Sequence, residues 1–157
     1  MRLFFCRWLM VAGVLSLPMA VSPRLGTGVP GPDYGNDPRL YKIRTFFASL
    51  DCPAWRYAAT FLEAADDYAL DWRLLPSLSY VETTGGKAAR NNNLFGWGSG
   101  RASFSSPHAA IHTIAFHLTH APHYRNKSLD ALLWTYNPHA EYAARVKSVM
   151  QRIAPTE

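Results

Sequence analysis

Cysteine is scarce in this chain of 157 residues, which contains only Cys6 and Cys52. Cys6 lies in the N-terminal segment that is expected to be removed, so no intramolecular disulfide is then available to the rest of the chain. Cys52 is predicted to be a small buried apolar residue. A nucleophilic Cys52 would need a histidine beside it, and the sequence does not establish one.

Charged residues are also few, at 17% of the chain, against 48% hydrophobic and 13% aromatic residues. That composition excludes a disordered chain and predicts one folded domain with a sizeable core. Internal repeats and strand-rich blocks are absent, so the predicted fold class is mainly α. The net charge of +5 suits a polyanionic surface such as a cell wall and is weak evidence for nucleic acid, which is not an expected partner.

The first 20 residues have the pattern of a secretory signal peptide. Arg2 and Arg7 accompany an apolar run that ends before Pro18, and Ala20 completes an imperfect cleavage site. The alternative is an uncleaved N-terminal anchor, although the run is short for a membrane span. We therefore expect a secreted, periplasmic or envelope-associated protein that contacts a membrane only if this leader stays attached.

Residues 21–38 are rich in proline and glycine and are predicted to form a flexible linker. The folded domain is then expected over residues 39–157. Removal of the leader would take away Arg2 and Arg7 and lower the net charge to +3. No feature of the sequence separates an interface from the core, and a monomer is expected.

Apolar periodicity and cap residues predict the helices of this domain. They are expected over 39–49, from about 51 to 69, from 71 to the glycines at 85–86, and over 107–119, 129–134 and 139–153. The predicted N-caps are Asp51, Asp71, Ser106 and Ser128. The stretch 87–105 has no helical period but carries large apolar residues, so it is predicted to be an ordered loop or a small β-hairpin region.

Carboxylates are absent between Glu82 and Asp130, a stretch that includes this whole loop. Glu82 follows Leu78 by four residues and Leu75 by seven, so helical spacing places it on their inward face. A carboxyl group there loses hydration, which is expected to raise its pKa and to favour a protonated general acid near neutral pH. The alternative is a Glu82 side chain that turns into solvent at the helix end.

Side-chain amides lie beside aromatic rings between Asn91 and Gly98. Amides donate and accept hydrogen bonds, and rings cover apolar faces, as an N-acetylated sugar requires. In the alternative, Leu94, Phe95 and Trp97 fill the core while the asparagines turn the chain. We expect both interpretations to hold, divided residue by residue.

Four segments together resemble the glucosaminidase domain family, glycoside hydrolase family 73, of the lysozyme and lytic transglycosylase superfamily. In chain order they read LSYVETTGGK, NNNLFGWGSG, FSSPHAAI and TYNPHAEYAARVKSVMQRI. The resemblance covers roughly Pro53 to Ile153 and is carried by the order and spacing of the motifs. It implies a mainly α, lysozyme-like helical domain with a small irregular or β-hairpin loop region beside the cleft.

The resemblance also implies roles for individual residues. Glu82 matches the catalytic acid, and Tyr136 matches the tyrosine near it. Asn93, Leu94, Phe95 and Gly96 match the family's NNLFG loop. The residues expected to bind substrate are these four together with Asn92, Trp97 and Asn137. The late motif, Tyr136-Asn137-Pro138, lacks the aspartate of the family's Tyr-Ala-Thr-Asp-Pro and is similar to the Tyr-Asn of lytic transglycosylases.

The function expected from the resemblance is cleavage of β-1,4 bonds in the N-acetylglucosamine and N-acetylmuramic acid glycan of peptidoglycan. Because no acid lies in the loop, Glu82 is expected to protonate the glycosidic oxygen and then act as a base, with the substrate's acetamido group or C6 hydroxyl as nucleophile. Asp130 or Glu141 could still fold back as a second carboxylate. The alternatives are a lytic transglycosylase and a non-catalytic glycan-binding module.

The spacing of two histidines raises the hypothesis of a metal site. His108 and His112 are four residues apart on one predicted helix, which fits two zinc ligands. The sequence lacks the adjacent glutamate of His-Glu-x-x-His hydrolases. An exposed histidine-rich face is therefore the expected arrangement, with no metal and no other cofactor.

Overall fold

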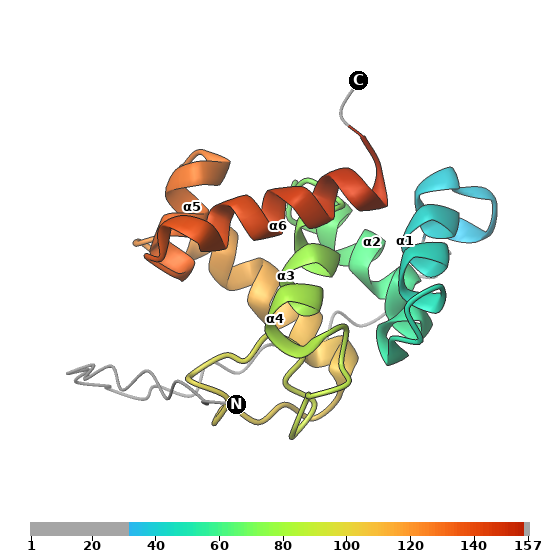
Figure 1. The fold of residues 1–157 in the computed structure, drawn as a ribbon, viewed down its shortest axis with the longest axis horizontal. Coiled ribbons are helices and arrows are strands. Elements are labelled where there is room, and N and C mark those ends of the chain that lie inside the picture. Colours follow the sequence, from blue (N-terminus) through green and yellow to red (C-terminus); the bar gives the residue numbers. More distant parts are fainter. Residues whose placement is uncertain (1–31, 156–157) are drawn as a thin grey trace, which may run out of the picture. The chain divides into compact units, whose positions relative to one another are not determined.

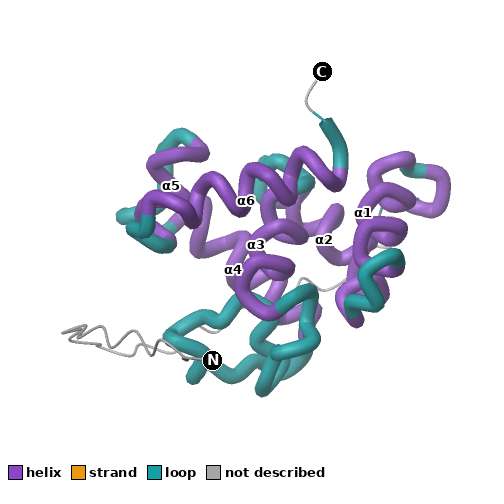
Figure 2. Tube along the Cα trace, viewed as in Figure 1, coloured by secondary structure: helices purple, strands orange, loops and turns teal. Residues whose placement is uncertain are grey.

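A computed structural model of the chain describes residues 32–155, which form six α-helices and two short 3₁₀ helices (Figure 1). The elements are η1 (Tyr34–Asn36), α1 (Pro38–Ala48), η2 (Pro53–Tyr57), α2 (Ala58–Asp67), α3 (Leu74–Thr83), α4 (Pro107–His120), α5 (Leu129–Tyr136) and α6 (Ala140–Ile153). These residues contain no strand, and their one isolated bridge joins Arg90 to Asn93 (Figure 2). The predicted mainly α class is confirmed, and the helices are consistent with a lysozyme-like domain.

The predicted leader at 1–20 and most of the predicted linker lie outside the described residues. The end of that linker is folded: Tyr34–Asn36 forms η1, and the Tyr34 hydroxyl donates a 3.1 Å hydrogen bond to Asp66 of α2. Arg39 of α1 donates to the same carboxylate at 2.8 Å. The folded domain therefore begins before residue 39. Between residues 32 and 155, no helix is long and apolar enough to cross a membrane.

Two helices start later than the sequence pattern predicts. Asp51 is not an N-cap, because its φ of 52° lies in the left-handed region; the chain continues as η2, and α2 begins only at Ala58. Asp71 forms a turn before α3 by accepting hydrogen bonds from the N–H groups of Arg73 and Leu74, at 2.9 and 2.8 Å. The predicted caps of α4 and α5 are confirmed, since the hydroxyls of Ser106 and Ser128 each accept a bond from the backbone N–H three residues on.

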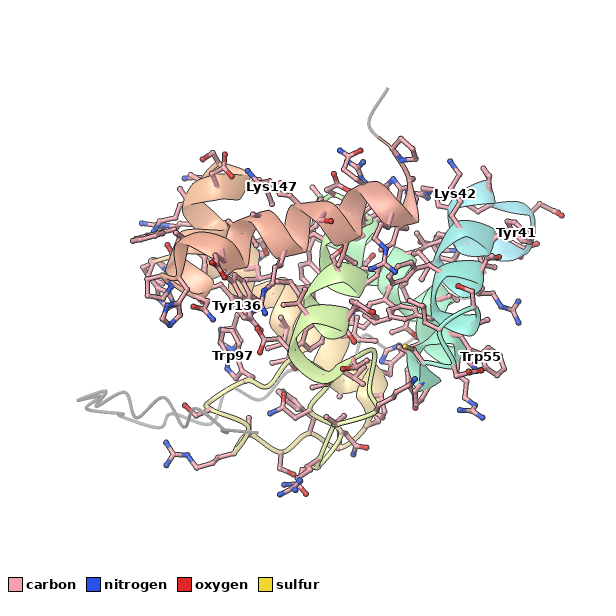
Figure 3. All side chains as sticks on the ribbon, in the orientation of Figure 1. Tyr41, Lys42, Trp55, Trp97, Tyr136 and Lys147 are labelled. Carbon is pink, nitrogen blue, oxygen red and sulfur yellow. The ribbon has the colours of Figure 1, made fainter. Side chains whose placement is uncertain are left out.

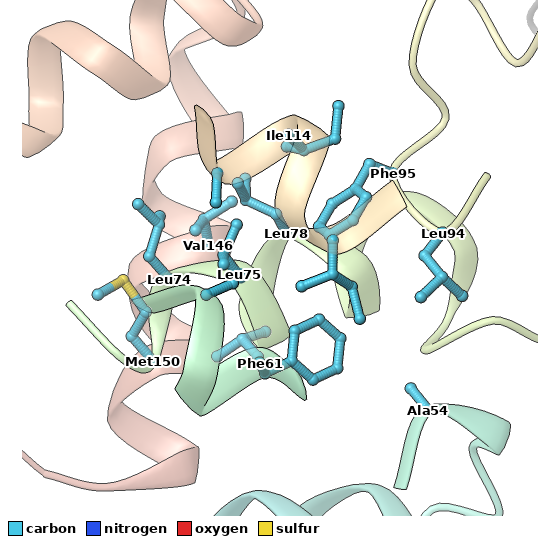
Figure 4. Packing of buried hydrophobic residues seen from close by; sticks show 14 of the residues in the cluster. Ala54, Phe61, Leu74, Leu75, Leu78, Leu94, Phe95, Ile114, Val146 and Met150 are labelled. Atoms are coloured by element: carbon cyan, nitrogen blue, oxygen red, sulfur yellow. The ribbon is translucent and has the colours of Figure 1, made fainter. Parts of the chain in front are cut away.

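The core lies where α2, α3, α4 and α6 meet (Figure 4), and it extends to α1, whose Ile43, Phe46 and Phe47 belong to the same buried cluster. The side chains drawn there include Phe61, Leu74, Leu75, Leu78, Ile114, Val146 and Met150, all of them buried. Leu94 and Phe95 reach this core from the loop after α3, and only 3% and 1% of them are exposed. Their burial fixes the loop at the C-terminal end of α3.

The end of α3 is shaped by a close contact with α1 and the segment after it. Thr84 stops the helix with a left-handed φ of 53°, and Gly85 follows with φ 59°. A Cβ at Gly85 would lie 2.8 Å from Cβ of Cys52 and 2.8 Å from the Phe47 ring, so a larger residue does not fit. Cys52 has a free thiol and is 1% exposed, which confirms the prediction of a buried apolar residue.

Candidate active site

Glu82 lies in the last turn of α3, half-buried between α6 and the loop that follows α3. Its Oε1 accepts a 2.7 Å hydrogen bond from the hydroxyl of Tyr142, which lies in the first turn of α6. Its Oε2 faces Gly96 of the loop, where an added Cβ would lie only 3.0 Å away. The two carboxyl oxygens therefore have different surroundings: one is held by a donor and the other faces a glycine.

Burial raises the pKa of Glu82 above its ordinary value, as the sequence predicts. The hydrogen bond from Tyr142 and the positive charge of Arg145 both lower this pKa, and burial outweighs them. Arg145 stands one turn beyond Tyr142 on α6. A carboxyl group in this environment keeps its proton to a higher pH than an exposed glutamate, which suits a general acid.

Tyr142 is the site residue that sequence analysis missed, since its position on the apolar face of α6 predicts a core residue. Its side chain is indeed buried, with 1% exposed. Burial and the charge of Glu82 raise the pKa of its hydroxyl, so it stays protonated and remains a donor. The sequence feature that could have indicated Tyr142 is its hydroxyl group. A buried tyrosine hydroxyl needs a polar partner, and Glu82 is an isolated acid that could be that partner.

Rings from four parts of the chain form a row that ends at the Glu82 carboxyl group. His117 of α4 stacks on Trp97 of the loop at 5.6 Å, Trp97 lies 5.7 Å from Tyr136 of α5, and Tyr136 stacks on Tyr142 at 5.8 Å with an interplanar angle of 8°. We call these four rings the aromatic row. Figure 3 shows Trp97 and Tyr136 beside each other, and both are half-buried. Such partly exposed rings can cover the apolar face of a sugar.

Tyr136 reaches the site through this stacking and not through a hydrogen bond to Glu82. Its hydroxyl donates a 2.9 Å bond to the carbonyl oxygen of Phe95. Burial raises the pKa of Tyr136 well above its ordinary value, and the negative charge of Glu82 raises it further. Tyr136 therefore fixes the loop to α5, and its predicted contact with the N-acetyl group of a substrate stays a prediction.

Asn93 shapes the loop and does not offer its amide to a ligand. It is 2% exposed, its Nδ2 donates to the carbonyl oxygens of Trp97 and Ala102 at 2.9 and 3.2 Å, and its Oδ1 accepts from the Trp97 N–H at 2.9 Å. The predicted substrate contact through this side chain is corrected, because every part of the amide is already bonded within the loop. Its effect on the site is to place Trp97.

The other predicted residues divide between the core and the surface. The buried side chains of Leu94 and Phe95 cannot cover a sugar, and their carbonyl oxygens accept hydrogen bonds from the hydroxyls of Thr83 and Tyr136. Asn92 is exposed and donates to the carbonyl oxygen of Phe104 at 2.8 Å. Asn137 is half-buried and accepts a 3.2 Å bond from the His139 N–H at the start of α6. Glu82, Gly96, Trp97 and Tyr136 are the predicted residues that lie together.

The two acids considered as a second carboxylate point elsewhere. Asp130 is exposed and pairs with Lys147 at 2.7 Å. Glu141 is exposed in the first turn of α6, and it precedes Tyr142, so helical geometry turns its side chain about 100° away from the side that Tyr142 presents to Glu82. The charged group that acts on the pKa of Glu82 is Arg145.

The predicted exposed histidine face is only partly present on α4, because His108 and His120 are exposed whereas His112 and His117 are half-buried. Two of these histidines converge on an acid. Nε2 of His108 and Nε2 of His112 lie 3.5 and 3.7 Å from Oε2 of Glu63 on α2. Within residues 32–155, these three side chains form the cluster that could hold a metal ion, and they are separate from the contacts of Glu82.

No protein-family model matches the sequence, and no curated protein is significantly similar to it. The resemblance to the glucosaminidase family rests on the four segments quoted above.

Proposed function

We propose that this protein is a secreted peptidoglycan hydrolase that cleaves β-1,4 glycosidic bonds with Glu82 as its general acid. The observation that carries the proposal is the half-buried Glu82 carboxyl group, held by Tyr142 at one end of the aromatic row. Its raised pKa suits proton donation, and the neighbouring rings suit the apolar faces of N-acetylated sugars. The predicted signal peptide supports an envelope location, where peptidoglycan is the partner.

The hydrogen-bond pattern favours one carboxyl oxygen as the proton donor. Oε1 accepts the bond from Tyr142, so the proton resides on Oε2. Gly96 lies against that side, and a side chain there would meet Oε2 at 3.0 Å. In the first step Oε2–H protonates the glycosidic oxygen while the bond from that oxygen to the anomeric carbon breaks.

A group of the substrate itself acts as the nucleophile that replaces the leaving oxygen at the anomeric carbon. Its acetamido oxygen can bond to the anomeric carbon and close a five-membered ring. Water then attacks the anomeric carbon, displaces the acetamido oxygen and gives its proton to the Glu82 carboxylate. Alternatively the C6 hydroxyl attacks, gives its proton to Glu82 and leaves a 1,6-anhydro end. Tyr142 and Arg145 stabilise the carboxylate form that exists between the two proton transfers.

Hydrolysis is the proposed outcome, on the resemblance to the glucosaminidases. A lytic transglycosylase is the second candidate, because Asp130 and Glu141 are both turned to other surroundings and a single acid is enough for the anhydro product. The aromatic row serves either enzyme as the surface that holds the glycan beside Glu82.

The test is mass spectrometry of the fragments released from purified peptidoglycan. Wild-type protein is compared with Glu82→Gln, which keeps an acceptor for Tyr142, and with Glu141→Gln as a matched carboxylate control. We expect reducing N-acetylglucosamine ends from the wild type and the control, and a loss of at least about 10²-fold in Glu82→Gln. Anhydromuramic ends would identify the transglycosylase instead.

Undiminished release by Glu82→Gln would overturn the assignment of the acid. If neither protein releases fragments while both sediment with the insoluble wall, the enzyme proposal fails. The non-catalytic glycan-binding module would then take its place.

A further inference from the structure

Glu63 of α2 and His108 and His112 of α4 place three metal-ligating side chains together on the face where these two helices pack. One donor atom from each lies within 4.8 Å of the other two. Glu63 has no lysine or arginine partner in the part of the chain that the structure describes. We propose that these three residues form a binding site for a divalent transition-metal ion of the Zn²⁺ class.

The spacing of the donor atoms fits a tetrahedral ion. Zinc bonds of about 2.0–2.2 Å to nitrogen and oxygen set neighbouring ligand atoms roughly 3.4 Å apart. Oε2 of Glu63 is 3.5 Å from Nε2 of His108 and 3.7 Å from Nε2 of His112. The two imidazole rings are stacked with centroids 4.5 Å apart, because the residues are one helical turn apart on α4. An ion would need only small side-chain movements to bind.

The surroundings of His112 give independent support. Its Nε2 is buried and has no hydrogen-bond partner, an arrangement that proteins avoid unless something else occupies the atom. Its Nδ1 lies 3.9 Å from Oδ2 of Asp67, one turn beyond Glu63 on α2. Metal-binding histidines usually direct their second nitrogen toward a carboxylate, which fixes the ring and its tautomer. Nε2 is thus the metal-facing atom, and Asp67 supplies a carboxylate on the Nδ1 side of the ring, beyond hydrogen-bond distance.

The donor set also indicates which ions bind. Two imidazoles and one carboxylate suit Zn²⁺, Ni²⁺ or Cu²⁺, whereas Mg²⁺ and Ca²⁺ prefer sites made of oxygen alone. The His108 side chain is 58% exposed, so water can supply the fourth ligand. Because the ligands come from α2 and α4, the bound ion would cross-link two helices of the core and stabilise the folded state.

The metal site is separate from the Glu82 site. On α4, His117 of the aromatic row lies five residues beyond His112, which is about 140° round the helix. The ion therefore does not replace Glu82 in the proposed cleavage. Zn²⁺ binding at this cluster does not depend on whether Glu82 cleaves glycan.

The experiment uses purified protein without a polyhistidine tag, stripped with EDTA and dialysed. Isothermal titration with ZnCl₂ is expected to show one ion per chain with a micromolar or lower dissociation constant. Thermal unfolding is expected to move upward by several degrees with ZnCl₂ and not with MgCl₂. His108→Ala and Glu63→Gln are expected to weaken binding at least tenfold; both side chains are substantially exposed, so the fold is retained.

His139→Ala is the matched control, because His139 is exposed outside the cluster and its loss should leave Zn²⁺ binding unchanged. The proposal is overturned if wild-type protein shows no saturable Zn²⁺ binding. It is equally overturned if His108→Ala and Glu63→Gln bind Zn²⁺ as tightly as the wild type.

Discussion

The hydroxyl of Tyr142 donates a 2.7 Å hydrogen bond to Oε1 of Glu82, joining two residues that are 60 positions apart in the chain. The bond connects the first turn of α6 to the last turn of α3. It holds one oxygen of a half-buried carboxyl group and leaves the other facing Gly96. The orientation and the acidity of Glu82 both depend on this contact.

Replacing the donor tests that dependence. Tyr142→Phe keeps the ring and removes the hydroxyl that lowers the pKa of Glu82, so this pKa should rise further. If Glu82 is the general acid of the proposed glycan cleavage, the rate falls as Glu82 loses its proton. The alkaline limb of the profile of kcat/KM against pH should therefore move to higher pH. We also expect kcat to fall about tenfold, because the carboxylate loses a charge-assisted bond.

Tyr124→Phe is the control for this profile. Tyr124 is also buried and lies beside Trp97, but its ring is not bonded to Glu82. Its pH profile should match the wild type. An unmoved alkaline limb in Tyr142→Phe would show that Glu82 is not the group that titrates there.

The pH dependence of stability gives a test without substrate. Glu82 has a folded-state pKa above its ordinary value of 4.5, so below pH 4.5 both the folded and the unfolded chain hold the proton and no stability is lost. As pH rises, the unfolded chain releases its proton first, and stability falls until the folded-state pKa is passed. Glu82→Gln avoids that loss and should melt a few degrees above the wild type at pH 7 to 8.

The difference in melting temperature should shrink as the pH is lowered to 4. Thermal unfolding of both proteins across this pH range is the measurement. A constant difference, or a variant less stable than the wild type at neutral pH, would contradict a raised pKa at Glu82.

Alanine substitutions at Gly96 and Gly100 distinguish the cost of backbone strain from the effect of a side chain beside Glu82. Gly96 has φ 59° and Gly100 has φ 78°, so alanine at either position should cost about 1–2 kcal/mol of stability. Only at Gly96 does the new Cβ meet Glu82, at 3.0 Å from Oε2, whereas nothing lies within 4 Å at Gly100. We expect Gly96→Ala to lower kcat at least tenfold and Gly100→Ala to leave kcat near the wild type. Equal rates in the two variants would mean that space beside Oε2 is unimportant.

Asn93 is expected to act on stability and, through Trp97, on binding. Asn93→Ala removes three hydrogen bonds to the backbone of Trp97 and Ala102 inside the loop, which should cost about 1–3 kcal/mol in denaturant unfolding. KM for glycan fragments should rise because Trp97 is no longer fixed. Asn92→Gly removes one exposed amide and tolerates the φ of 59° at that position, so its cost should be smaller. A larger loss in Asn92→Gly would contradict the structural role of Asn93.

The sequence by itself determined the helical class, the positions of the caps at Ser106 and Ser128, and the choice of Glu82 as the candidate acid. Helical periodicity and capping are local properties, since they depend on residues within one or two turns. The raised pKa of Glu82 also followed from local spacing, because Leu75 and Leu78 place it on a buried face. The start of α2 escaped prediction because Asp51 takes the left-handed position that ends α1, which glycine usually occupies: the N–H groups of Asp51 and Cys52 donate to the carbonyl oxygens of Ala48 and Phe47.

Only the tertiary structure decided what surrounds Glu82. Tyr142, Gly96 and Arg145 reach it from α6 and the loop, and their approach depends on how α3 packs on α6, which no local pattern records. Only the tertiary structure brings Glu63 to His108 and His112, because Glu63 lies on α2 and the two histidines lie on α4. A sequence pattern shows which residue types can do chemistry. Core packing sets the short distances between residues that are far apart in the chain, such as the 2.7 Å between Tyr142 and Glu82, and these distances determine which residues can act together.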